Sequence, residues 1–102
     1  MISLKKALAQ AKKNKVAIAH FNFSELTTLH ACFDAARELS KAHNLPPIPL
    51  IFGLSEGERA AIGLHEGVAM VRQLRKQYDY PVFINADHHK SVESCKAAID
   101  AG

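Results

Sequence analysis

The sequence predicts an α/β protein in which three parallel strands are each followed by a helix, with one short helix before the first strand. Three apolar runs alternate with segments whose apolar residues recur at helical spacing, as in parallel sheets with right-handed crossovers. The runs centre near Ala19, Leu50 and Phe83, about 31 and 33 residues apart. A TIM (β/α)8 barrel uses roughly 31 residues per unit. The spacing therefore fits the N-terminal (β/α)3 part of such a barrel, as it also fits other α/β folds.

The leading helix is predicted at residues 3–13, where Leu4, Leu8 and Ala11 share one face and the lysines take the other. The first strand is predicted at residues 16–23. This stretch is a continuous apolar run with β-branched and aromatic residues, which is typical of a strand buried on both faces of a parallel sheet.

The second helix is expected to have Ser24 as its N-cap and Glu25 in its first turn, where the helix dipole favours a carboxylate. Apolar residues recur at helical spacing to about Ala42. Residues 44–47, with two prolines, then end the helix because proline cannot continue it.

The second strand is predicted at residues 48–52, although Pro49 lacks the N–H that a central strand needs. A loop is expected at 53–57 and a helical region at 58–78, followed by the third strand at 81–86. Gly63 and Gly67 are expected to divide the long helical region into two pieces. Ser91 is expected to cap the last helix.

The end of the sequence indicates an incomplete domain. Ala101-Gly102 is typical of a helix C-terminus, with glycine at the position that takes a left-handed conformation. Three parallel strands alone leave two open edges and exposed apolar faces. We therefore expect the sequence to be a fragment, or a truncated reading, of a longer protein.

Composition narrows the class of protein. The 102 residues are 48% hydrophobic and 23% charged, as in ordinary globular domains. The net charge of +3 comes largely from lysines on the polar face of the leading helix, so no nucleic-acid partner is expected. No apolar run approaches the ~20 residues that cross a bilayer, so no membrane partner is expected. Cys32 and Cys95 have no metal or disulfide spacing, which favours reduced thiols and a cytoplasmic location.

Polar clusters follow each predicted strand, at residues 20–24, 55–59 and 85–91. The carboxyl ends of parallel strands meet at one edge of the sheet, where active sites form. In the third cluster, Asp87 is a candidate acid or base and His88 a candidate zinc ligand. Adjacent histidines rarely chelate one metal, so at most one of the pair is a ligand. The alternative is an Asp that caps a helix, beside two exposed imidazoles.

The other clusters carry weaker signals. Ser55 begins an S-x-x-E capping box, and its hydroxyl could instead bind a substrate phosphate or hydroxyl. Asn22 could bind substrate or satisfy loop backbone groups. His20 is interpreted as a structural residue of the strand. Surface ion pairing is the default interpretation of the remaining charged residues near these tips, which are Glu25, Glu56 and Arg59.

Taken in order, these segments resemble the opening of the class II fructose-bisphosphate and tagatose-bisphosphate aldolases. The resemblance is carried by VAIAHFN at 16–22, LSEGER at 54–59 and YPVFINADHHKS at 80–91, and it covers essentially the whole chain. The resemblance implies a zinc-dependent TIM barrel that reversibly cleaves a ketose bisphosphate to dihydroxyacetone phosphate and glyceraldehyde 3-phosphate. It also implies a phosphorylated sugar substrate and a homo-oligomer when the protein is full length.

The resemblance also assigns roles to residues. His88 matches the family's first zinc-binding histidine, and Asp87 matches the catalytic acid/base. Ser55 matches a hydroxyl that binds the glyceraldehyde 3-phosphate part, and Asn22 matches a strand-one asparagine near the substrate. The resemblance further implies that residues 1–102 are the N-terminal fragment of a single aldolase-type TIM-barrel domain. The remaining Zn²⁺ ligands are expected beyond residue 102, so this chain alone is expected to be inactive. One departure is His20, which stands where the family usually has a small residue and is expected to narrow the site.

Two alternatives stay open at this point. The open edges and exposed apolar faces would also suit a non-catalytic, half-barrel-like module that associates with itself. A different TIM-barrel metal enzyme acting on phosphorylated sugars would keep Asp87 and His88 but differ downstream.

Overall fold

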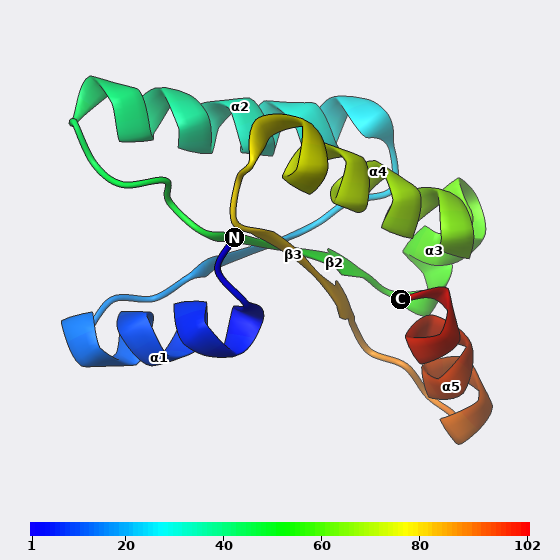
Figure 1. The fold of residues 1–102 in the computed structure, drawn as a ribbon. Coiled ribbons are helices and arrows are strands. Elements are labelled where there is room, and N and C mark those ends of the chain that lie inside the picture. Colours follow the sequence, from blue (N-terminus) through cyan, green and yellow to red (C-terminus); the bar gives the residue numbers. More distant parts are fainter.

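The computed structural model describes residues 1–102 and shows strands and helices alternating along the chain, after one leading helix (Figure 1). This order confirms the α/β fold class. None of the helices is both long and apolar enough to span a membrane. The elements are α1 (Leu4–Asn14), β1 (Ala19–Asn22), α2 (Leu26–Ala42), β2 (Leu50–Leu54), α3 (Glu56–Ile62), α4 (Leu64–Tyr78), β3 (Val82–Ala86) and α5 (Val92–Ala101).

Strand β2 begins and ends later than the sequence predicted. It starts at Leu50, so Pro49 precedes the strand and its missing N–H costs no ladder hydrogen bond. It continues through Gly53 and Leu54, which had been assigned to a loop, because both pair with β3. The two added residues carry β2 to the point where the polar clusters lie.

Two helix boundaries also differ from the prediction. The N-cap of α2 is Glu25 and not Ser24, because the Glu25 carboxylate accepts hydrogen bonds from the backbone N–H groups of Thr27 and Thr28. The Thr28 hydroxyl also donates to this carboxylate, and that bond is the main reason that the pKa of Glu25 lies below its ordinary value, with the backbone bonds adding to it. Only Gly63 divides α3 from α4.

Gly67 lies inside α4, and the reason for a glycine there is space. A Cβ atom at this position would lie 2.5 Å from the Leu54 side chain, so the helix approaches β2 more closely than alanine would allow. The predicted break at Gly67 was therefore wrong, and the residue instead serves helix–sheet packing.

The three strands form one parallel sheet in the order β1-β2-β3. The register pairs Asn22 with Gly53 and Gly53 with Asn85, so these residues form one row at the carboxyl ends of the strands. Figure 1 shows α3 and α5 at this end of the sheet and α1 toward the opposite end. The predicted convergence of the three strand ends is thus confirmed.

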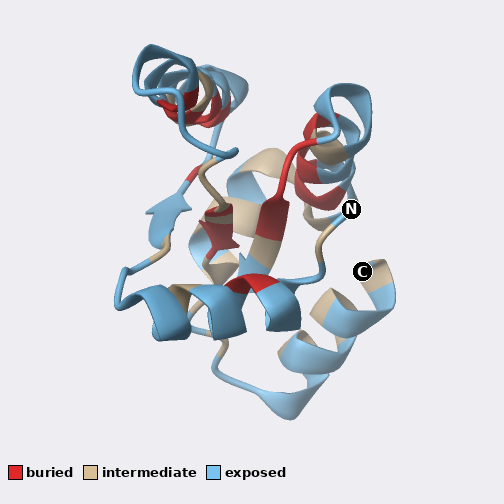
Figure 2. Ribbon diagram, turned by 60° about the vertical axis from the view of Figure 1, so that its left-hand side comes forward, coloured by how far each residue is buried: buried red, intermediate tan, exposed pale blue.

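Helices α2 and α4 cover one face of the sheet, and the core lies between them and the strands (Figures 1 and 2). Phe33 of α2 is fully buried, and its ring meets the ring of Tyr80 edge-on at 5.2 Å between centroids. Burial of each such side chain contributes about 1.5–3 kcal/mol. The cluster comprises Phe23, Leu29, Phe33, Ala36, Leu50, Phe52, Leu54, Val71, Leu74, Tyr80 and Val82.

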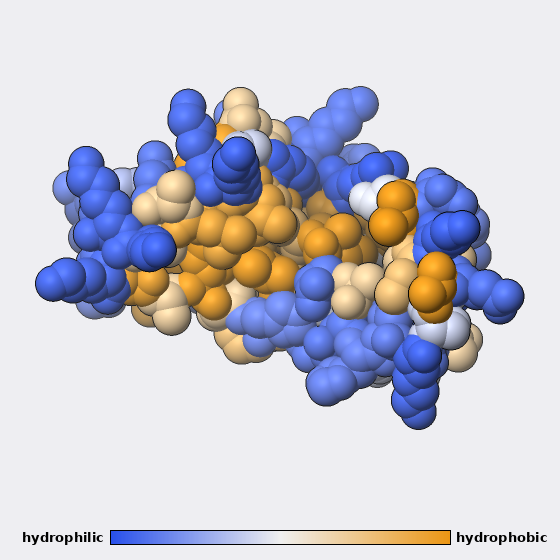
Figure 3. All heavy atoms as spheres, turned by 90° about the horizontal axis from the view of Figure 1, so that it is seen from below, coloured by the Kyte–Doolittle hydropathy of each residue, from blue (hydrophilic) through white to orange (hydrophobic).

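Apolar side chains are also exposed, as the sequence predicted for an open sheet. Figure 3 shows them gathered in the middle of the face seen from below, with hydrophilic residues around them. Phe21 of β1 and Ile99 of α5 are among the large apolar residues left in solvent. Both β1 and β3 are edge strands of this sheet.

Ser40 joins α2 to the segments that lead into β2 and β3. Its hydroxyl lies 3.2 Å from the Tyr80 hydroxyl and donates to the Ala36 carbonyl oxygen at 2.8 Å. It also accepts from the Ile48 backbone N–H at 3.1 Å. Because Ser40 is buried, loss of this oxygen would leave polar groups without partners.

We expect Ser40→Ala to lower the free energy of unfolding by about 1–3 kcal/mol, the usual cost of unpaired buried polar groups. Tyr80→Phe should cost less, because it removes one hydroxyl and leaves the Ile48 N–H paired with Ser40. Urea denaturation of the two variants and the wild type measures both values. Equal losses, or a larger loss for Tyr80→Phe, would contradict this assignment.

Candidate active site at the strand ends

Asn22 is the centre of a polar cluster at the carboxyl ends of the strands. Its side-chain amide nitrogen Nδ2 lies 2.9 Å from Asp87 Oδ2 and 2.9 Å from Glu58 Oε2. The amide donates both of its hydrogens, one to each carboxylate. It therefore links the end of β1 to the segment after β3 and to α3.

Asp87 is held in place by its backbone as well as by its side chain. Its N–H donates to the Leu54 carbonyl oxygen at 2.9 Å, which extends the β2–β3 ladder by one residue. Ser91, and not Asp87, is the N-cap of α5. The interpretation of Asp87 as a helix cap was therefore wrong, and its carboxylate faces Asn22 instead.

The pKa of Asp87 lies below its ordinary value of 3.8, mainly because the carboxylate accepts the hydrogen bond from Asn22. Desolvation opposes this shift. Asp87 is therefore ionised at neutral pH. Oδ2 is engaged by Asn22, whereas Oδ1 lies 4.0 Å from His88 Nε2.

Ser55 is the N-cap of α3 and forms the predicted capping box with Glu58. The Ser55 hydroxyl accepts from the Glu58 N–H at 3.2 Å, and Glu58 Oε2 accepts from the Ser55 N–H at 2.6 Å. The same Oε2 also accepts from Asn22. One carboxylate oxygen thus connects two of the predicted substrate-binding residues, Ser55 and Asn22.

Glu58 was not singled out as a site residue from the sequence. The capping box itself was the available signal, because it turns the Glu58 carboxylate back toward the end of β2. Desolvation opposes ionisation of Glu58, but the hydrogen bonds from Ser55 and Asn22 outweigh it and lower the pKa. Two ionised carboxylates therefore share one amide donor.

His88 has a different environment from its neighbours. Its φ of 47° is in the left-handed region, and its side chain is 86% exposed. The Asp87 side chain, in contrast, is only 25% exposed. No hydrogen bond engages either ring nitrogen of His88, so both are free to bind a ligand.

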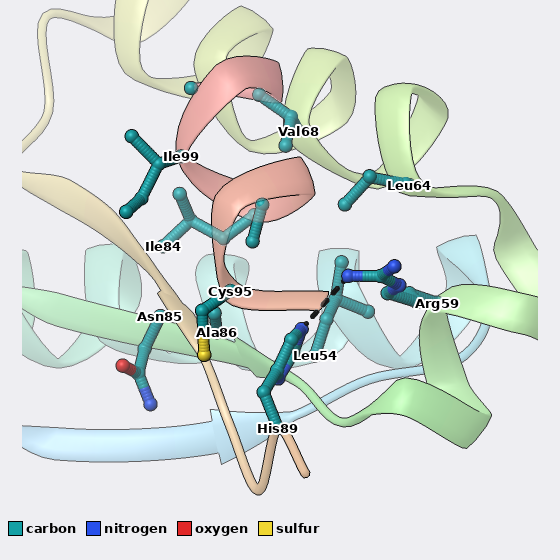
Figure 4. A pocket seen from close by; sticks show the side chains of 12 residues that line it. Leu54, Arg59, Leu64, Val68, Ile84, Asn85, Ala86, His89, Cys95 and Ile99 are labelled. Carbon is teal, nitrogen blue, oxygen red and sulfur yellow. Dashed lines mark hydrogen bonds between the residues drawn. The ribbon is translucent and has the colours of Figure 1, made fainter. Parts of the chain in front are cut away.

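His89 is fully engaged and is not available as a ligand. Its Nδ1 lies 2.9 Å from the Asp87 carbonyl oxygen, and Arg59 Nη1 lies 3.1 Å from its Nε2 (Figure 4). A carbonyl only accepts and a guanidinium only donates, so the ring is neutral with its proton on Nδ1. Arg59 also donates to the Ser94 carbonyl oxygen, and the expected surface ion pair of Arg59 does not form.

Glu56 and His20 complete the strand-end region. Glu56 accepts from the Lys90 backbone N–H at 2.8 Å, and this bond is the main cause of its lowered pKa. Its predicted role in a surface ion pair is therefore replaced by a bond to backbone. His20 Nε2 lies 3.2 Å from Asn85 Nδ2, on the same exposed side of the sheet as Asn22.

An apolar cavity lies nearby, between α4, α5 and the strands β2 and β3 (Figure 4). Most of its lining is aliphatic, including Leu64, Val68 and Ile99. Asn22, Ser55, Asp87 and His88 do not line it. The four residues that the sequence predicted as site residues are therefore outside the cavity.

Comparison with known proteins identifies the class. Residues 2–102 match the family model of class II fructose-bisphosphate aldolase, and the chain belongs to that family. It is 36% identical to a fructose-bisphosphate aldolase of Staphylococcus epidermidis and 37% identical to that of Geobacillus stearothermophilus. Each match covers the whole of this chain and 34% of the relative. The chain thus spans about a third of the length of these relatives.

The fold agrees with this assignment. The structure of the YdjI aldolase from Escherichia coli K12 superposes with a TM-score of 0.79 at 24% sequence identity. The superposition covers 99% of this chain and 37% of that one. Residues 1–102 therefore have the fold of one part of an aldolase barrel.

We expect Asn22→Leu to raise the pKa of Glu58, because it removes a donor to the carboxylate. A lowered folded-state pKa gives stability that is fully present above the unfolded value and lost as the pH falls through the folded value. The ordinary pKa of Glu58 is 4.5. The stability difference between wild type and variant should therefore be constant above about pH 4.5 and shrink below it.

Denaturation with urea at a series of pH values measures this difference. Asn14→Leu, at the end of α1 and outside the cluster, is the matched control and should show no such pH dependence. A stability gap between Asn22→Leu and wild type that stays constant through the acid range would contradict the hydrogen-bond assignment.

Ser55→Ala should destabilise the chain by about 1 kcal/mol, the usual cost of losing an N-cap side chain. Ser55→Thr keeps the hydroxyl and should lose less. Thermal and urea unfolding measure both variants. If alanine and threonine behave alike, the hydroxyl does not cap α3.

Proposed function

We propose that residues 1–102 are the N-terminal part of a zinc-dependent class II ketose-bisphosphate aldolase. The complete protein would reversibly cleave fructose 1,6-bisphosphate, or a related ketose bisphosphate, to dihydroxyacetone phosphate and glyceraldehyde 3-phosphate. One observation carries the proposal beyond family membership. The ionised Asp87 is fixed by Asn22 directly beside the exposed, unengaged imidazole of His88.

Asp87 is proposed as the catalytic acid/base. In cleavage the substrate hydroxyl next to the breaking carbon–carbon bond must lose its proton, and in condensation the same oxygen regains it. Asp87 is ionised and can accept that proton on Oδ1, because Asn22 occupies Oδ2. The fixed carboxylate therefore takes up the proton in cleavage and returns it to the same oxygen in condensation.

His88 is proposed as one zinc ligand. An exposed imidazole with both nitrogens free fits a single ligand position at a strand end. The chain contains no group of three or more His, Cys, Asp and Glu side chains arranged to hold a metal, and a catalytic zinc takes three protein ligands. The other ligands would therefore come from outside residues 1–102. When bound, zinc supplies a Lewis acid for the negative charge that develops on substrate oxygens.

Ser55 and Asn22 are proposed to bind substrate. The Ser55 hydroxyl accepts from the α3 backbone, which leaves its own O–H free to donate to a phosphate or hydroxyl of the glyceraldehyde 3-phosphate part. Asn22 presents its amide oxygen, because its nitrogen is engaged by two carboxylates. Both groups are polar, and both are linked to Asp87 through hydrogen bonds.

The cellular setting is part of the same proposal. The free thiols of Cys32 and Cys95 suit a reducing, cytoplasmic location. A phosphorylated sugar substrate would place the reaction in carbohydrate metabolism, such as glycolysis. A homo-oligomeric full-length protein is proposed from family membership alone.

We expect Asp87→Asn, in the complete gene product that contains this chain, to lower kcat by about 10²–10⁴-fold, the usual contribution of a positioned acid/base. Its zinc content should be unchanged, because His88 is intact. His88→Ala should instead lose zinc and activity together. An aldol-cleavage assay and metal analysis by mass spectrometry measure these outcomes.

His43→Ala is the matched control, since this exposed imidazole lies at the C-terminal end of α2, away from the strand ends. It should keep both zinc and activity. Absence of zinc and of aldol cleavage from the wild-type complete protein would contradict the proposed function. Full zinc content in His88→Ala would contradict the ligand role of His88.

A further inference from the structure

The His20 side chain crosses over a strand. His20 is on β1 and Asn85 is on β3, and β2 lies between these two strands. Even so, His20 Nε2 lies 3.2 Å from Asn85 Nδ2, within hydrogen-bond distance. The imidazole therefore lies across β2, on the side of the sheet that carries Asn22.

Gly53 of β2 makes this crossing possible. A Cβ atom at Gly53 would lie 2.3 Å from His20 Cε1 and 2.5 Å from His20 Nε2, distances that real contacts do not show. The same Cβ would lie 3.3 Å from Asn22 Nδ2. The imidazole of His20 thus packs directly against Gly53, in space that any side chain at that position would fill, and the amide of Asn22 is close by.

The backbone does not require glycine at this position. Positive φ values among the glycines occur only at Gly63 and Gly102. A glycine inside a strand weakens the strand and often marks a close approach by another group. Here the group that approaches is the His20 ring, so space for that ring explains the glycine.

We propose that His20 is a positioning residue of the active site, a proposal that rests on the proposed function. Its imidazole lies over Gly53, close to the Asn22 amide that holds Asp87. It bonds to Asn85, which is two residues before Asp87, and it acts on the carboxylate through that bond. His20 thereby fixes the catalytic carboxylate without touching the substrate.

One further observation supports this role. His20 is exposed in the chain, so its ring gains little from burial, and a contribution to stability is a poor explanation for its placement. His20 was interpreted from the sequence as a structural residue of the strand, and its position over Gly53 gives it a second purpose.

The test compares four variants of the complete gene product. His20→Ala removes the imidazole and its bond to Asn85. We expect kcat to fall roughly 10–100-fold and KM to change less than about twofold, because small displacements of a catalytic group lower the rate strongly. His20→Gln should recover most of the loss, because its amide can still bond to Asn85. Gly53→Ala should lose as much as His20→Ala, because the added methyl group displaces the ring.

The double variant His20→Ala/Gly53→Ala decides whether the two residues form one unit. The methyl group then occupies space that the ring has left, so the double variant should be no worse than either single variant. Losses that add would overturn the pairing. Unchanged kcat and KM in His20→Ala would overturn the positioning role.

A spectroscopic readout keeps this test separate from the proposed function. With ¹⁵N-labelled asparagine, the side-chain amide signals of Asn22 and Asn85 should shift in His20→Ala, whereas the signal of Asn44 should not. If the wild type has no aldolase activity but these shifts occur, the proposed function fails and the arrangement around Gly53 stands. If the amide signals stay in place, the arrangement itself is refuted, whatever the activity.

Discussion

The double hydrogen bond from the Asn22 amide to Asp87 and Glu58 is the interaction on which the strand-end arrangement depends. One neutral donor group separates two carboxylates that would otherwise repel each other, and it keeps both ionised. Each residue has a second anchor: the Asp87 N–H donates to the Leu54 carbonyl oxygen, and the Glu58 carboxylate accepts from the Ser55 N–H. The amide therefore links the end of β1 both to α3 and to the segment after β3.

Parallel register is what brings these groups together. Asn22, Gly53 and Asn85 share one row of the sheet, and the two asparagine side chains lie on the side away from the buried cluster. A one-residue shift of β1 or β3 would turn its asparagine toward the helices. The buried Phe52, on the opposite side from Gly53, fixes that register through the core. Core packing thus determines the geometry of the site.

The sequence was sufficient for the features that depend on local pattern and chain topology. Strand spacing placed Asn22, Ser55 and Asp87 at one edge, and the S-x-x-E pattern predicted the α3 cap. Contacts between residues far apart in the chain could not be predicted. The Glu58–Asn22 and Arg59–His89 bonds depend on rotamers set by surrounding packing. The α2 cap was missed because Ser24 and Glu25 both suit an N-cap, and only the backbone path chooses between them.

The three consecutive residues Asp87, His88 and His89 show how one short segment can perform three tasks. The left-handed φ of 47° at His88 turns the chain sharply, at a cost that L-residues usually avoid. The turn sends Asp87 toward Asn22 and His89 back toward Arg59, and it leaves His88 in solvent. Because both flanking side chains are bonded, the strained conformation is held in place. His88 is therefore presented at a fixed position while remaining free to bind.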